Sequence, residues 1–175
     1  MNRILIIGGG ASGMAAAISA AQANPSAQIT ILDGLDRIGK KILATGNGRC
    51  NLTNAQISLG HYHTQNTARL NDLLADMPAE RPLAFFRELG LYCTEEDRGR
   101  IYPYSRQASM VLDVLKLALQ RHHIQVQHNC KVKSLSVQKK VFTAQTESGQ
   151  IFHADAVILA AGGRAAPKQG TNGTS

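Results

Sequence analysis

The sequence predicts an α/β fold built on a parallel β-sheet, and three features of the chain carry this prediction. Residues 4–7 and 29–32 are short apolar runs separated by a glycine turn and an alanine-rich segment, which is the pattern of a strand–helix–strand unit. Residues 155–160 form another apolar run, typical of a strand buried on both faces. Between residues 130 and 154, three short segments with polar turns predict an antiparallel meander that leads into this last strand.

The turn after the first strand has the spacing of a dinucleotide-binding motif. It reads Gly8-x-Gly10-x-x-Gly13, and Asp33 follows twenty residues after the last glycine. Gly8 permits a tight turn, Gly10 lets a pyrophosphate approach the backbone, and Gly13 lets the helix pack closely on the strands. The helix N-terminus adds unpaired N–H groups and a positive dipole end, and Asp33 would accept hydrogen bonds from an adenosine ribose. The stretch predicts a Rossmann-like nucleotide site; a glycine turn without a ligand is the alternative.

Composition and charge narrow the class of protein. With 175 residues, 43% of them apolar and 18% charged, the chain is predicted to form one globular domain. No apolar run reaches membrane-spanning length, so no membrane partner is expected. Cys50, Cys93 and Cys130 form neither a CxxC nor a zinc pattern, which favours a reducing, cytoplasmic location. The net charge of +7 would suit nucleic acid, but the basic residues are scattered, so a basic surface around a phosphate-bearing cofactor is preferred.

Residues 34–54 show little periodicity and are predicted to form a long functional loop. Its glycines and asparagines permit unusual backbone angles and close approach to a flat ligand. Lys40, Lys41 and Arg49 supply cations that suit phosphate or an anionic ring. A solvated basic loop is the alternative interpretation.

Three helices are predicted between this loop and the meander. Apolar spacing predicts the first over residues 66–77. The second is predicted over residues 80–89, with Pro82 in its first turn and Gly90 as its C-terminal stop. The third is expected over residues 106–122, with Ser105 as its N-cap. It is expected to be buried, because much of its circumference is apolar: Met110, Val111, Val114, Leu115, Ala118 and Leu119.

The remaining strands follow from short alternating or apolar runs. A hairpin is predicted from residues 91–93 and 100–102 around a turn at 95–99. Further strands are expected over residues 124–127, 130–137 (with Val132 and Leu135 facing inward), 141–146 and 151–154. No metal site is expected, because neither His122-His123 nor His61-x-His63 has a third ligand at suitable spacing.

Four blocks of the sequence resemble one flavoprotein family. Residues 8–13, 39–54, 99–103 and 157–163 are similar to the HI0933-like family, also called the BaiN/YhiN-like oxidoreductases. The resemblance extends over essentially all 175 residues, and the block from Gly46 to Asn54 is highly specific. It implies an FAD-binding domain of the glutathione-reductase type with a meander crossover. It also implies an FAD-dependent oxidoreductase that transfers hydride to or from a small organic substrate, with NAD(P)H as electron donor.

The resemblance assigns cofactor contacts to this chain. The turn Gly8–Gly13 would hold the FAD pyrophosphate, Asp33 the adenosine ribose, and residues 39–51 would follow the pyrophosphate and the isoalloxazine. Val132 would meet the adenine through its backbone, and Ala161-Gly162 would cover the middle of the cofactor. No catalytic residue is assigned. The implied cofactor-binding residues are Gly8, Gly10, Ala11, Ser12, Gly13, Asp33, Gly39, Lys40, Lys41, Asn47, Gly48, Arg49, Cys50, Asn51, Val132, Ala161 and Gly162.

The chain departs from the family pattern at two positions and is shorter than family members. Asp33 stands where relatives often have Glu, and Asn47 interrupts an otherwise all-glycine turn. Residues 1–175 are therefore expected to be an N-terminal FAD-binding part that needs the remainder of its own chain to complete the flavin site. Tyr102 and Tyr104 are candidates either for a substrate pocket or for structural roles. Two alternative functions stay open: an NAD(P)-binding dehydrogenase domain, against which the meander counts, and an FAD protein that acts on RNA.

Overall fold

The computed structural model describes residues 2–163 and divides into two structural units. The first unit takes the described residues of Met1–Ile42 and Leu115–Ser175, and the second is Leu43–Val114. Each unit has its own sheets. The residues after Gly163 lie outside the described part of the chain.

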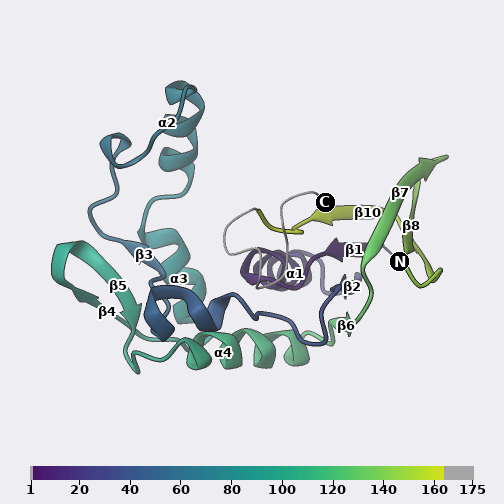
Figure 1. The fold of residues 1–175 in the computed structure, drawn as a ribbon, viewed down its shortest axis with the longest axis horizontal. Helices are drawn as coiled ribbons and strands as arrows, with labels where there is room; N and C mark the ends of the chain where they lie inside the picture. Colours follow the sequence, from purple (N-terminus) through teal and green to yellow (C-terminus); the bar gives the residue numbers. More distant parts are fainter. Residues whose placement is uncertain (1, 164–175) are drawn as a thin grey trace. The chain divides into compact units, whose positions relative to one another are not determined.

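A parallel sheet with strand order β10-β1-β2-β6 forms the centre of the first unit (Figure 1). Its strands are β1 (Arg3–Ile7), β2 (Gln28–Leu32), β6 (Gln125–Gln127) and β10 (Ala156–Leu159). Helix α1 (Ala11–Ala23) connects the first two strands and packs on β1, β2 and β10. The predicted strand–helix–strand unit and the late parallel strand are therefore confirmed. The burial expected for the last strand is wrong, because β10 lies at the edge of the sheet and its Leu159 is 70% exposed.

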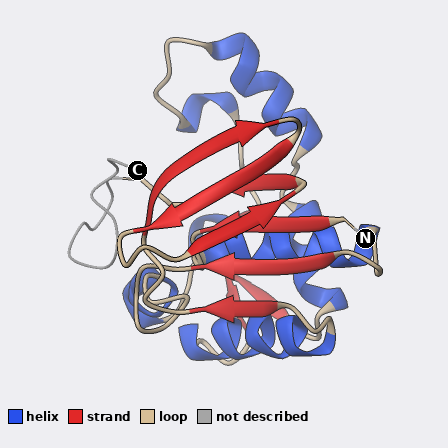
Figure 2. Ribbon diagram, turned by 90° about the vertical axis from the view of Figure 1, so that its right-hand side faces the viewer, coloured by secondary structure: helices blue, strands red, loops and turns tan. Residues whose placement is uncertain are grey.

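A three-stranded antiparallel meander precedes the last parallel strand. It consists of β7 (Val132–Gln138), β8 (Val141–Thr146) and β9 (Ile151–Ala154), which form a sheet of their own. Figure 2 draws the strands of the chain in red and the helices in blue. Ala144 and Ala154 of the meander form a core cluster with Leu5 and Leu32 of the parallel sheet. Since side chains alternate along a strand, this face of the parallel sheet is the one opposite Ile6 and Ile31. The predicted meander crossover is confirmed.

One inward position of the meander was predicted wrongly. Val132 is half-buried and packs on the core cluster, as expected. Leu135 is instead 38% exposed. It lies on β7, which is an edge strand whose residues after Val132 are all exposed. Alternation predicts that two residues share a face, but whether that face is covered depends on its neighbours.

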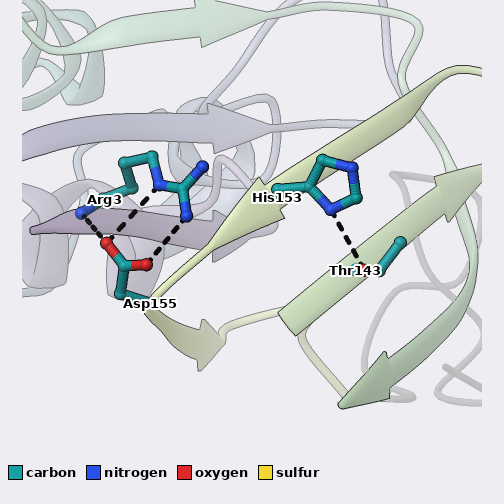
Figure 3. A network of polar contacts seen from close by, with 4 residues as sticks. All are labelled: Arg3, Thr143, His153 and Asp155. Carbon is teal, nitrogen blue, oxygen red and sulfur yellow. Dashed lines mark hydrogen bonds and ion pairs between the residues drawn. The ribbon is translucent and has the colours of Figure 1, made fainter. Parts of the chain in front are cut away.

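An ion pair ties the start of β1 to the residue that separates β9 from β10 (Figure 3). Arg3 Nη2 donates to Asp155 Oδ1 at 2.8 Å, and the Arg3 backbone N–H donates to Asp155 Oδ2 at 2.8 Å. These hydrogen bonds from Arg3 lower the pKa of Asp155 to about 2. Nearby, the side chains of Thr143 and His153 lie 3.1 Å apart on opposed positions of β8 and β9.

The second unit is built around a small antiparallel sheet with strand order β3-β5-β4. The strands are β3 (Thr53–Asn54), β4 (Cys93–Glu96) and β5 (Arg100–Pro103), and a 3-10 turn at Asp97–Gly99 joins the last two. The predicted hairpin is confirmed, but its first strand begins two residues later than expected. A second correction concerns residues 34–54, which contain the 3-10 segments of Ile42–Gly48 and strand β3 rather than an irregular loop throughout.

Within the described residues, the three helices predicted after the long loop are present, and their ends lie within two residues of the predicted ones. They are α2 (Thr67–Asp76), α3 (Glu80–Glu88) and α4 (Ala108–Arg121), with a short 3-10 turn at Leu59–His61. The predicted N-cap at Ser105 is wrong: Arg106 has a φ of 54°, which a right-handed helix excludes. Met110, expected to be buried, is 43% exposed. No helix in the described part of the chain is long and apolar enough to cross a membrane.

Candidate functional site

The glycine turn at the carboxyl end of β1 has the tight geometry that its sequence indicates. Gly8 has a φ of 107°, and a Cβ atom there would collide with the carbonyl oxygen of Ala160. A Cβ atom at Gly13 would collide with the carbonyl oxygen of Gly8, so the first turn of α1 packs directly on the strand end. Both glycines are therefore required by contacts within the protein.

Gly10 differs from its neighbours, because no atom of residues 2–163 lies within 4 Å of a Cβ atom placed at this position. Its φ of −77° is also accessible to any residue. Ala11 and Ser12, which follow at the start of α1, are exposed. The first turn of α1 contains no acidic residue, and its N–H groups lack intrahelical acceptors. The turn thus presents open space and unpaired N–H donors at the positive end of a helix dipole, which suits a pyrophosphate.

Asp33 lies at the carboxyl end of β2 and holds this turn in place. Its carboxylate accepts hydrogen bonds from the N–H of Gly9 at 2.6 Å and of Leu35 at 2.8 Å. The side chain is largely covered, with the residue 9% exposed. Its backbone N–H donates to Gln127 at 3.0 Å, and its carbonyl accepts from Cys130 at 2.8 Å. A carboxylate oxygen can accept more than one hydrogen bond, so a ribose hydroxyl can still be accommodated.

The segment after Asp33 folds back onto the glycine turn. The N–H of Gly39 donates to the carbonyl of Gly9 at 2.9 Å, and buried Ile38 packs on Gly9. Lys41 Nζ lies 3.4 Å from the carbonyl oxygen of Gly163, beyond the end of β10. The first unit therefore brings together residues that are far apart in sequence: the glycine turn, Asp33, the segment Gly39–Lys41 and the residues after β10.

The residues predicted to contact the adenine and the middle of the cofactor also lie in the first unit. Val132 begins β7, close in sequence to Cys130, whose N–H contacts Asp33. Ala161 and Gly162 follow β10, and Gly162 has a φ of 87°. Their roles toward adenine and the middle of a cofactor stay predictions.

The predicted site residues Asn47–Asn51 belong to the second unit, where they form a strained turn. Left-handed φ values occur at Gly46 (54°), Asn47 (57°), Gly48 (81°) and Cys50 (59°). A Cβ atom at Gly46 would lie 2.7 Å from the backbone nitrogen of Asn51. With its amide nitrogen turned toward Thr53 and Ile101, the Asn51 side chain donates to both carbonyls, at 2.9 and 3.1 Å. The unusual backbone angles expected here are present.

Arg49 is held by three contacts within the second unit. Its guanidinium carbon lies 4.3 Å from the ring centroid of Tyr102, and its Nη2 donates to the Tyr102 hydroxyl at 3.3 Å. Its Nη1 donates to Glu96 Oε2 at 3.1 Å. Arg106 Nε lies 2.9 Å from Glu96 Oε1, at an angle too poor for a hydrogen bond. Glu96 and Arg106 were not predicted as site residues, because only the folded sheet brings them to Arg49.

The tyrosines differ in exposure, and the cysteines are free thiols. Tyr102 is buried beneath Arg49, whereas Tyr104 is 78% exposed. Burial raises the pKa of the Cys50 thiol, and a hydrogen bond with Thr45 opposes that shift, so the thiol is not activated as a thiolate. Cys50, Cys93 and Cys130 are free cysteines. Within residues 2–163, no three His, Cys, Asp or Glu side chains come together as a metal site.

Comparison with known proteins identifies the relatives of this chain. The family model of the HI0933-like protein Rossmann domain matches residues 2–175. The chain is 45% identical over 174 residues to a 3-dehydro-bile acid delta(4,6)-reductase of Clostridium scindens, covering 99% of this chain and 42% of that protein. It is 28% identical to a ribosomal RNA dihydrouridine synthase of Haemophilus influenzae, covering 95% of this chain and 41% of that protein. The chain thus spans less than half the length of the curated relatives it matches.

Solved structures share the fold at low sequence identity. An open conformation of a flavocytochrome c3 fumarate reductase matches with a TM-score of 0.63 and 17% identity, covering 95% of this chain and 34% of that one. The Thermovibrio ammonificans THI4 structure matches with a TM-score of 0.61 and 13% identity, covering 94% and 57%. These likenesses support the Rossmann-type parallel sheet and its meander.

Proposed function

The chain belongs to the HI0933-like Rossmann domain family, and on this basis we propose that it forms the FAD-binding part of a flavin-dependent oxidoreductase. The observation that carries the proposal is the cradle at Gly10, where open space meets the unpaired N–H groups of α1. A glycine turn with a purely structural role would not need open space at this position. Gly8 and Gly13 are required because a Cβ atom at either position would collide with a backbone carbonyl oxygen, whereas Gly10 leaves room for a ligand.

The residues of the first unit have distinct proposed roles toward FAD. The N–H groups from Gly10 to Gly13 bind the pyrophosphate, and Asp33 accepts hydrogen bonds from the adenosine ribose while it holds Gly9. Lys40 and Lys41 add positive charge near the phosphates. Val132 and Ala161-Gly162 would contact the adenine and the middle of the cofactor through their backbone. When bound, FAD supplies the hydride chemistry, and the protein supplies binding and orientation.

The proposed reaction is reduction of a small organic substrate with NAD(P)H as electron donor. Both relatives have names that describe the reduction of a carbon–carbon double bond, in a bile acid or in uridine. The 45% identity to the bile-acid enzyme, against 28% to the RNA enzyme, favours a small molecule. A simple NAD(P)-binding dehydrogenase is disfavoured, because the crossover before β10 is a meander rather than a helix.

Modification of ribosomal RNA is the second candidate function. Two observations favour it: the name of the second relative and the net charge of +7. Against it, the lysines and arginines are spread along the chain rather than gathered in one basic stretch. The binding of a uridine-containing RNA, measured against salt concentration, tests it directly. No retention of the RNA at low salt would remove this candidate.

The main proposal is tested by the visible absorption spectrum of the purified full-length protein. A flavin spectrum, with FAD identified by mass after its release, is the expected result. NAD(P)H oxidation is then followed with an unsaturated steroid ketone as substrate. A colourless protein that cannot take up added FAD would contradict the proposal.

A further inference from the structure

A carboxylate held between two arginines stands out in the second unit. Glu96, at the end of β4, contacts Arg49 from the segment before β3 and Arg106 from the turn after β5. The Glu96 side chain is only 18% exposed, whereas those of Arg49 and Arg106 are 38% and 64% exposed. Two guanidinium groups and one carboxylate leave an excess of one positive charge. A partly covered site with this excess favours an anionic partner.

Arg106 contacts Glu96 through only one of its three guanidinium nitrogens. Among the described residues, its ion pair is with Glu96 Oε1, and that contact involves its Nε. Its two terminal nitrogens carry four further N–H donors, on a side chain that is mostly exposed. Its backbone has a φ of 54° and its N–H donates to the Pro103 carbonyl at 2.7 Å. Strained backbone at a residue other than glycine is frequent at binding sites, and here the guanidinium of that residue contacts a half-buried carboxylate.

Two exposed aromatic rings lie just outside the strands β4 and β5 that carry part of the charge cluster. Tyr92 and Tyr104 lie opposite each other, since the Tyr104 N–H donates to the Tyr92 carbonyl at 2.8 Å. Their exposed fractions are 73% and 78%. Tyr104 lies in the turn after β5, two residues after Tyr102, the ring beneath Arg49, and two residues before Arg106. The hairpin and the turn that follows it therefore carry exposed aromatic surface close in sequence to Arg106.

We propose that Arg106, oriented by Glu96, binds the carboxylate of a small ring-bearing substrate whose apolar body lies on Tyr92 and Tyr104. This inference rests on the proposed reductase function and adds the chemical class of its ligand. A single excess charge matches one carboxylate, whereas an RNA strand would call for several cations along its backbone. Aromatic faces beside one guanidinium suit an amphipathic acid. Glu96 is a positioning residue here, because it acts through Arg106.

Calorimetric binding to the full-length protein tests this assignment, with cholate and its uncharged methyl ester as probes. Replacing Arg106→Gln should weaken cholate binding about tenfold and leave ester binding unchanged, because only the acid uses the charge. Arg98→Gln, which removes an exposed arginine of the same unit, should change neither. Tyr104→Ala should weaken both probes. Glu96→Gln should reduce the preference for the acid, and Glu96→Asp should restore part of it.

Several results of the same binding measurements would contradict the role proposed for Arg106. Equal loss of acid and ester binding in Arg106→Gln, or no loss at all, would overturn the role of Arg106. Binding of oligouridylate but not cholate would assign this face to RNA instead. If Arg106→Gln fails to fold, Arg106→Lys keeps the charge and should retain most of the preference for the acid. Because calorimetry needs no turnover, a flavin-free protein that still prefers the acid would contradict the reductase proposal alone. A flavin-bound protein without that preference would contradict only this inference.

Discussion

The backbone N–H of Gly9 donates a 2.6 Å hydrogen bond to the carboxylate of Asp33, so the acid that ends β2 fixes the turn that ends β1. The two strands are parallel neighbours in the sheet, with Ile7 paired to Leu32. Their carboxyl ends therefore lie at one edge, where Asp33 reaches across to the turn. The same side chain is proposed to contact the ribose, which couples phosphate binding to adenosine binding through one carboxylate.

Replacing Asp33→Ala should lower both FAD affinity and stability. The change leaves the N–H groups of Gly9 and Leu35 without their acceptor, which costs about 1–3 kcal/mol for a buried donor. Loss of the ribose contact should weaken FAD binding by roughly tenfold or more. Flavin fluorescence titration measures the affinity, and urea unfolding measures the stability. The control Asp36→Ala removes an exposed acid three residues away and should change neither quantity; unchanged FAD affinity in Asp33→Ala would show that the ribose role is misassigned.

Gly10→Ala and Gly13→Ala should separate binding from folding. A methyl group at Gly10 meets no atom of the described residues, so the free energy of unfolding should change by less than about 1 kcal/mol. The methyl would occupy the space proposed for the pyrophosphate, and FAD affinity should fall at least about tenfold. Gly13→Ala collides with the Gly8 carbonyl and should cost about 1–3 kcal/mol or more. Normal FAD binding by Gly10→Ala would mean that the pyrophosphate lies elsewhere.

The ion pair between Arg3 and Asp155 should stabilise the fold only when the carboxyl group is ionised. Its pKa falls from 3.8 to about 2 in the folded protein, mainly through the hydrogen bonds from Arg3. A lowered pKa contributes stability that is fully present above pH 3.8 and lost as the pH falls toward 2. The melting temperature of Asp155→Asn should therefore lie below that of the wild type at neutral pH and converge with it in that acid range. In an Arg3→Gln background most of this pH-dependent difference should disappear; a difference that persists there would assign the effect to another partner.

Gly46→Ala should destabilise the second unit more than Gly48→Ala. Both positions have left-handed φ values, 54° and 81°, and an alanine there costs about 1–2 kcal/mol. At Gly46 the new Cβ atom would also lie 2.7 Å from the Asn51 nitrogen, while at Gly48 it would meet no atom within 4 Å. Urea unfolding of the two variants should give a larger loss for Gly46→Ala, by about 1–2 kcal/mol. Equal losses would show that the turn relaxes without cost.

The sequence alone determined the strand–helix–strand unit, the meander and the late parallel strand. Residues 4–7 and 156–160 are apolar throughout, which is typical of strands in a parallel sheet. The glycine spacing predicted the turn, because backbone conformation depends on a few adjacent residues. Local propensity gave α2 and α3 nearly to the residue, with Asn66 accepting from the Arg69 N–H at 3.0 Å as N-cap of the former.

Tertiary structure decided what depends on contacts between distant segments. Helix α4 begins at Ala108 rather than Arg106, because Arg106 adopts a left-handed backbone and contacts Glu96. Leu135 stays exposed because β7 is an edge strand. The hydrogen bond from Gly9 to Asp33 joins positions 24 residues apart, and the contact of Arg49 with Glu96 joins positions 47 residues apart. Periodicity fixes which residues share a strand or helix face, but the partner of a polar side chain is set only when the sheets assemble.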